Sequence, residues 1–218
     1  MIVEEVIPTW RGLLHAYVFW LALGAAAALL AIAPTADARV ASGIYGGALC
    51  CLFAISGLYH RWRWNPSWRP WLRRIDHSTI YLFIAASYTP LGWLVLSGAT
   101  QWIVLTTVWA GAAAGVTLSI AWINAPRALC ALCYVALGWV AVLAFPQLRA
   151  ELPMIALVLV GLGGVLYTIG AVIFALGRPN PWPKVFGFHE IFHVFVILAA
   201  TTHFVAMAGW IVPSGLEG

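Results

Sequence analysis

Two histidines stand one helical turn apart at the start of the last apolar segment, within His189-Glu190-Ile191-Phe192-His193. Side chains four residues apart lie one above the other on a helix, so both imidazoles could bind one metal ion. The segment also satisfies the H-E-x-x-H pattern of zinc proteases, in which the glutamate is the general base. Only this helix of such a site is present, so further ligands would have to come from distant segments inside a membrane.

The composition is that of a polytopic membrane protein. Of the 218 residues, 63% are hydrophobic and only 8% are charged, and the mean hydropathy is +0.94. Such a chain would leave large apolar surfaces in water, so we expect it in a cell membrane, which it crosses several times. The net charge of +4 comes from arginines grouped in loops, which gives no basic surface for nucleic acid. The four cysteines lie in or beside apolar segments and imply no disulfide framework.

The apolar segments predict one all-α domain over residues 1–218, a bundle of seven transmembrane helices. Each segment is near the ~20 residues that cross a bilayer, and Pro, Gly or charged residues separate them. The first is read as a retained helix rather than a cleaved signal peptide. The predicted helices span residues 13–33, 41–60, 76–97, 101–123, 127–146, 153–176 and 189–212.

The basic residues predict the orientation of the bundle. One set of connections holds only Arg39 and Arg149. The N-terminus and the other connections hold Arg11, Arg61, Arg63, Arg69, Arg73, Arg74, Arg127, Arg178 and Lys184. Because positive charge gathers on the cytoplasmic side, the N-terminus is expected inside and the C-terminus outside.

This orientation brings a set of polar residues to one level near the cytoplasmic face. His60 ends the second predicted helix, Asp76 begins the third, and His189 and His193 open the seventh. Ser56 lies on the same face as His60, about one turn or ~6 Å deeper. Ionisable residues are costly inside a membrane and mark function by default.

Three neutral imidazoles favour a catalytic Zn²⁺, because they leave a fourth tetrahedral position for water. Zinc lowers the pKa of that water to ~7 and polarises a carbonyl. Asp76 could act as general base or bind the metal through water, and Ser56 could orient a ligand or the water. Structural roles stay open: Asp76 could cap its helix or pair with a nearby arginine, and Ser56 could bond to a neighbouring helix.

The remaining candidates are weaker. His203 lies about 21 Å along the helix from His189, too far to share one metal, and is expected to pack in the bundle. His77 points about 100° away from Asp76, and His15 is a reserve ligand on the first helix. The pair Cys130 and Cys133 has the spacing of a redox motif without its βαβ context, which favours simple packing.

These residues strongly resemble the motifs of the hemolysin III family, the bacterial branch of the progestin and adiponectin receptor family. That group belongs with alkaline ceramidases to a wider set of membrane-embedded hydrolases. The matching blocks, in order along essentially the whole chain, are 56–60, 74–77 with 86–90, and 186–193 with His203 following.

The resemblance implies a seven-helix bundle with zinc held by His60, His189 and His193, completed by Asp76 and Ser56 through water and hydrogen bonds. It also implies a link to membrane lipid homeostasis. The leading hypothesis is a zinc-dependent hydrolase of a lipid-like amide or ester, with membrane lipids as partners. The alternatives are a cytolysin or pore-forming protein and a zinc-stabilised sensor without catalysis; the family name by itself decides no activity. The oligomeric state is not predicted.

Overall fold

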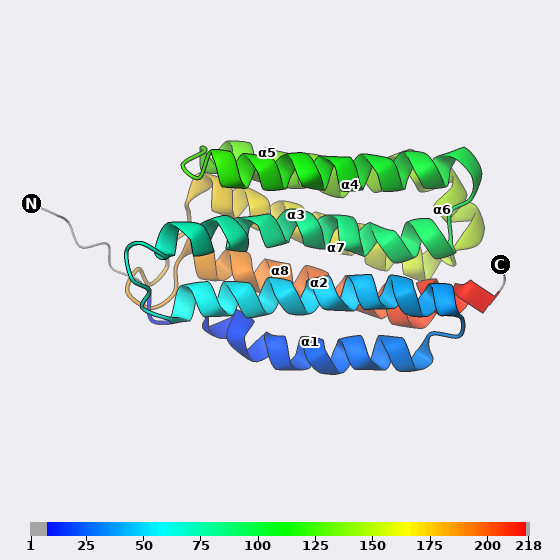
Figure 1. Ribbon diagram of the computed structural model, residues 1–218, viewed down its shortest axis with the longest axis horizontal. Coiled ribbons are helices and arrows are strands. Elements are labelled where there is room, and N and C mark those ends of the chain that lie inside the picture. Colours follow the sequence, from blue (N-terminus) through cyan, green and yellow to red (C-terminus); the bar gives the residue numbers. More distant parts are fainter. Residues whose placement is uncertain (1–7, 217–218) are drawn as a thin grey trace, which may run out of the picture.

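The computed structural model describes residues 8–216, and within this range all regular secondary structure is helical apart from one isolated bridge between Trp182 and Phe186. The long helices lie side by side as one bundle (Figure 1). They are α1 (Leu13–Ile32), α2 (Ala36–Arg61), α3 (Arg69–Leu94), α4 (Gly98–Ala121), α5 (Arg127–Gly138), α6 (Phe145–Glu151), α7 (Met154–Leu176) and α8 (Phe188–Ala206). A 3₁₀ segment, η1 (Trp139–Ala144), joins α5 to α6, and α8 continues into a π-helical turn, η2 (Met207–Ile211), and a short 3₁₀ turn, η3 (Pro213–Leu216).

The outer surface of the bundle suits lipid. Within residues 8–216, six helical segments are long and apolar enough to span a membrane: α1, α2, α4, the segment Arg127–Glu151, α7, and α8 with η2. Large apolar side chains point outward from them, including Trp20, Leu21 and Leu176, which are 69%, 72% and 69% exposed. A water-soluble protein rarely exposes so much contiguous apolar surface. The protein is therefore a multi-pass membrane protein.

Helix α3 is as long as α2, at 26 residues, but is more polar than the six candidate spans. Its position explains the difference, because it lies between α2 and α4 (Figure 1) and packs against both. Its buried face includes polar residues such as Ser78, Thr79 and Thr89. Neighbouring helices shield these groups from lipid, so α3 does not need the hydropathy of a lipid-facing helix.

Two helices begin earlier than the sequence predicts. Helix α2 starts at Ala36 rather than 41, because the Thr35 hydroxyl accepts a hydrogen bond from the Ala38 N–H at 3.2 Å and caps the helix. Helix α3 starts at Arg69 rather than 76, with Pro70 in its first turn. The predicted ranges followed the apolar runs, whereas the first two turns of α3 contain Arg69, Arg73 and Arg74.

The fifth helix is expected to end at residue 146, but the helical segment continues from Arg127 to Glu151. Pro146 is tolerated because it lies in the first turn of α6, where its missing N–H is not needed. The change from α-helix to the 3₁₀ segment η1 interrupts the regular pattern of backbone hydrogen bonds. The hydroxyl of Tyr88, on α3, bonds to two backbone groups at this junction. It donates to the Gly138 carbonyl at 2.5 Å and accepts from the Ala141 N–H at 2.8 Å.

The bundle brings one end of four helices together. The start of α1, the end of α2, the start of α3 and the start of α8 all lie at the same end (Figure 1). Helix α1 packs against both α2 and α8, and α2 packs against α3. The fold thus gathers the segments that hold the candidate residues, although they are far apart in the sequence.

Candidate metal centre

The first turn of α8 is fixed by Glu190. One carboxylate oxygen, Oε2, accepts the Gly187 N–H at 2.7 Å, as in a capping box. The other oxygen pairs with the Arg11 guanidinium. Glu190 is only 1% exposed and does not line the large cavity described below. Both of its oxygens therefore hold the helix start and the N-terminal segment, which leaves Glu190 poorly placed to act as the base of a protease motif.

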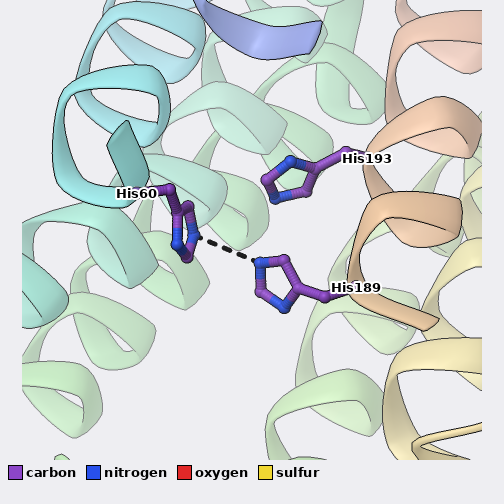
Figure 2. A group of neighbouring side chains, drawn as sticks. All are labelled: His60, His189 and His193. Carbon is purple, nitrogen blue, oxygen red and sulfur yellow. Dashed lines mark hydrogen bonds between the residues drawn. The ribbon is translucent and has the colours of Figure 1, made fainter. Parts of the chain in front are cut away.

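His60, His189 and His193 converge from α2 and α8 (Figure 2). Nε2 of His60 lies 3.1 Å from Nε2 of His189, and one nitrogen from each of the three rings falls within 4.8 Å of the others. Two nitrogen ligands at the zinc–nitrogen distance of ~2.0–2.1 Å lie roughly 3.4 Å apart in a tetrahedral site. The three imidazoles are therefore spaced to hold a single metal ion.

Asp76 lies beside this cluster but outside the three-histidine group. Its Oδ2 is 3.7 Å from Nε2 of His60, and the residue is 7% exposed. It comes from α3, whereas His189 and His193 come from α8. Asp76 is therefore placed to reach a group held by the histidines rather than to replace one of them.

A fourth histidine, His15 of α1, packs against the three-histidine cluster. Its ring stacks on that of His193, with centroids 3.8 Å apart and planes at 9°. Nδ1 of His15 shares a hydrogen bond of 2.8 Å with the Ser56 hydroxyl. The other nitrogen, Nε2, is buried without a partner among the described residues. The hydrogen bond from Ser56 thus fixes the orientation of the His15 ring, and the His15 ring in turn packs flat against the His193 ring.

Close packing of α1 on α2 makes this contact possible. Gly12 precedes α1 with φ of 73°, in the left-handed region, and a Cβ there would overlap the Cβ of His60. Gly57 lies near the end of α2, and a Cβ there would lie 3.0 Å from the backbone of Ala16. These two glycines allow the start of α1 to approach the end of α2 and bring His15 to Ser56.

We expect Gly12→Ala to lower both stability and metal affinity. The left-handed backbone costs a residue with a Cβ about 1–3 kcal/mol, and the added methyl group displaces His60. Thermal unfolding and zinc titration of the purified protein measure the two effects. Gly24→Ala is the matched control, because a Cβ at Gly24 meets nothing within 4 Å and alanine suits a helix interior. Equal melting temperatures for Gly12→Ala and the wild type would contradict this role.

The other predicted candidates lie apart from the cluster. His77 follows Asp76 and lines the cavity described in the next paragraph, but it is not in the three-histidine group. His203 bonds through Nε2 to the Val160 carbonyl at 3.1 Å, farther along α8. Cys130 and Cys133 are free thiols of α5 that pack against the core. The sequence indicated neither the stacking of His15 on His193 nor the Arg11–Glu190 pair, although His15 stood at the right level.

A cavity of about 300 Å³ opens from this cluster into the bundle. Asp76, His189 and His193 lie at one end of it, and Met207 lies at the other. Most of its wall is apolar, with contributions from α3, α5, η1, α7 and α8. The site is thus a polar cluster at the end of a long apolar chamber, an arrangement that suits an amphipathic ligand.

Comparison with known proteins gives the family. Residues 4–204 match the family model described as "Haemolysin-III related". Hemolysin-3 of Bacillus cereus is 31% identical over 180 residues, which cover 83% of this chain and 79% of the relative. The Hemolysin-3 homolog of Bacillus subtilis (strain 168) is 31% identical over 154 residues, 71% of this chain and 69% of the relative. The human monocyte to macrophage differentiation factor is 27% identical over 206 residues, 88% of this chain and 79% of the relative.

The resemblance seen in the sequence motifs is thus confirmed, and a bacterial member with these apolar helices lies in the plasma membrane. The match spans nearly all of the described residues, including every histidine of the cluster. This multi-pass membrane protein belongs to the haemolysin III family.

Proposed function

We propose that the protein is a zinc-dependent hydrolase of a lipid-like amide or ester and acts in membrane lipid homeostasis. The observation that carries the proposal is the three-histidine cluster at the end of an apolar cavity within the bundle. A polar, water-soluble substrate would be disfavoured in such a cavity, whereas an acyl chain finds there an apolar wall like the bilayer interior that it leaves.

Zinc is the metal that this donor set favours. Three imidazoles leave one tetrahedral position open, and a site of neutral nitrogen ligands suits Zn²⁺ better than Mg²⁺ or Ca²⁺, which prefer oxygen. Nε2 of His15, whose ring stacks on His193, is buried and has no hydrogen-bond partner among the described residues. An unpaired polar atom at this place is expected if a polar group binds at the histidine cluster. When bound, zinc would acidify a water molecule and polarise the substrate carbonyl.

The protein side chains then divide the remaining work. The cavity wall holds the acyl chain, which places the scissile carbonyl at the histidine cluster. Asp76, 3.7 Å from His60, accepts a proton from the attacking water and returns it to the leaving amine or alcohol. Ser56 positions His15 through their 2.8 Å hydrogen bond and acts on the site through that ring.

We also propose that seven helical segments cross the membrane, with α3 as the seventh span and the N-terminus in the cytoplasm. The shielded position of α3 supports the first part, and the loop arginines support the second. A reporter active only outside the cytoplasm, fused after Gly218, should be active, and the same reporter fused before Met1 should be silent. The reverse pattern would contradict the orientation.

The function is tested with the purified protein in lipid nanodiscs loaded with zinc. An N-acyl sphingoid base and a matched long-chain ester are supplied separately, and released fatty acid is measured by mass spectrometry. We expect release from at least one probe, and none above background from His193→Ala. Release equal in both proteins would overturn the proposal. Ion conductance in liposomes that persists in His193→Ala would favour a pore-forming protein instead.

A third outcome separates catalysis from a purely structural metal. If neither probe is hydrolysed but removal of zinc lowers the melting temperature, the cluster stabilises a sensor or signalling protein. Such a protein would keep its ligand affinity in the nanodisc assay without releasing product.

A further inference from the structure

The cavity has a second polar region, far from the histidine cluster. His203 of α8 and Tyr167 of α7 both line it, with ring centroids 5.5 Å apart. His203 follows His193 by ten residues on one helix, which places it about 15 Å farther along the axis. Between the two polar regions the wall is mainly apolar.

The hydrogen bonds of this region leave both a donor and an acceptor free. Nε2 of His203 lies 3.1 Å from the Val160 carbonyl, which can only accept, so Nε2 carries the proton and Nδ1 is left as an acceptor. The Tyr167 hydroxyl is buried and has no hydrogen-bond partner among the described residues. A hydroxyl group, which both donates and accepts, complements this pair.

Two buried hydroxyl groups of α2 do not line the cavity. Ser42 and Tyr45 are both 0% exposed, and their hydroxyls have no partner among residues 8–216. An unpartnered polar group in an apolar interior is costly, and of these three buried hydroxyls only that of Tyr167 belongs to a residue that lines the cavity, which favours a polar occupant beside it.

The residues of the cavity wall favour a ligand that is uncharged in this region. None of the described residues that line the cavity is a lysine or arginine. A carboxylate or phosphate would therefore be buried at Tyr167 and His203 without a cation, which is far more costly than burying a neutral group. The π-helical turn η2 follows directly after this region, and Met207 closes the cavity there.

We propose that Tyr167 and His203 bind a hydroxyl group of the lipid ligand, so that this protein prefers acyl chains hydroxylated about 15 Å from the carbonyl. The proposal rests on the proposed function only for the position of the carbonyl at the histidine cluster. Tyr167 donates to the ligand oxygen, and Nδ1 of His203 accepts the ligand proton. The polar region would then select a chain by the position of its hydroxyl rather than by length alone.

Binding, rather than turnover, tests this proposal. Zinc-loaded protein in nanodiscs is titrated with a saturated long-chain N-methyl amide and with isomers that carry one hydroxyl at successive carbons. A fluorescent amide serves as the displaced competitor. One neutral hydrogen bond contributes about 1–1.4 kcal/mol, so we expect one isomer to bind roughly 5- to 10-fold more tightly than the plain amide.

Tyr167→Phe should abolish that preference, so that in this variant the hydroxylated isomers and the plain amide bind with equal affinity. Tyr17→Phe is the matched control, because Tyr17 lies on α1 with 68% exposure and should keep the preference. The zinc content of each variant shows that the bundle is folded.

Three results would overturn the proposal: no isomer binds more tightly than the plain amide, the preference survives Tyr167→Phe, or none of the amides binds. Loss of the proposed function is a separate outcome. If the preferred isomer binds and depends on Tyr167, but neither the amide nor the corresponding ester is hydrolysed, the hydroxyl site stands and the hydrolase does not.

Discussion

His193→Ala is expected to lower the zinc affinity of the protein by more than about 100-fold, since loss of even an outer partner of a metal ligand costs roughly 10- to 100-fold. The variant removes one of only three nitrogen atoms that lie within 4.8 Å of one another. It also removes the ring on which His15 stacks. The measurement is zinc per chain by mass spectrometry after dialysis against a buffer of fixed free zinc.

The controls separate a specific ligand from any histidine in the bundle. His203→Ala and His77→Ala should keep the zinc content of the wild type, because neither residue belongs to the three-histidine group. His60→Ala should fall with His193→Ala, although the two residues come from different helices. If all four variants hold the same zinc, or if the wild type holds none, the cluster is not a zinc site.

Much of this site could be predicted because its ligands follow local rules. His189 and His193 share a helix face through their spacing alone, and the loop arginines place His60 and Asp76 at the same level. Helix periodicity and the positive-inside rule involve only short stretches of chain. The three histidines do meet in the structure, as those rules indicate.

The contacts of His15 could not be predicted in the same way. Its position depends on how α1 is rotated and how closely it approaches α2, which Gly12 and Gly57 decide through contacts across helices. The 3₁₀ segment η1 is a similar case. It is supported by Tyr88, fifty residues away from Gly138 in the sequence, so no pattern within the fifth apolar run could reveal it.

Helix α3 shows a different reason for a boundary error. Apolar runs mark the part of a helix that meets lipid, but α3 is shielded by its neighbours and extends beyond the apolar run to Arg69. Hydropathy therefore reports the lipid contact of a segment rather than its helical length. Asp76 lies about two turns beyond the start of α3, so it is not the residue that caps the helix.

The second large effect concerns Asp76. We expect Asp76→Asn to reduce fatty-acid release by about 10²- to 10⁴-fold, the usual contribution of a general base, while zinc still fills the site at saturating concentration. Asp76 is 7% exposed and lies beside His60, and asparagine has nearly the same size and should occupy the same place. The asparagine amide, however, cannot accept the proton of the attacking water. The rise of activity with pH that reflects deprotonation of this carboxyl should also disappear from the variant.

Glu190→Gln provides the matched comparison, because it removes a carboxylate from the other acidic residue near the histidines. Glutamine can still accept the Gly187 N–H that caps α8, although the charge pair with Arg11 is lost. We therefore expect a lower melting temperature for Glu190→Gln with fatty-acid release close to that of the wild type. If Glu190→Gln loses activity and Asp76→Asn keeps it, the base is Glu190, and the H-E-x-x-H pattern describes the chemistry as it does in soluble proteases.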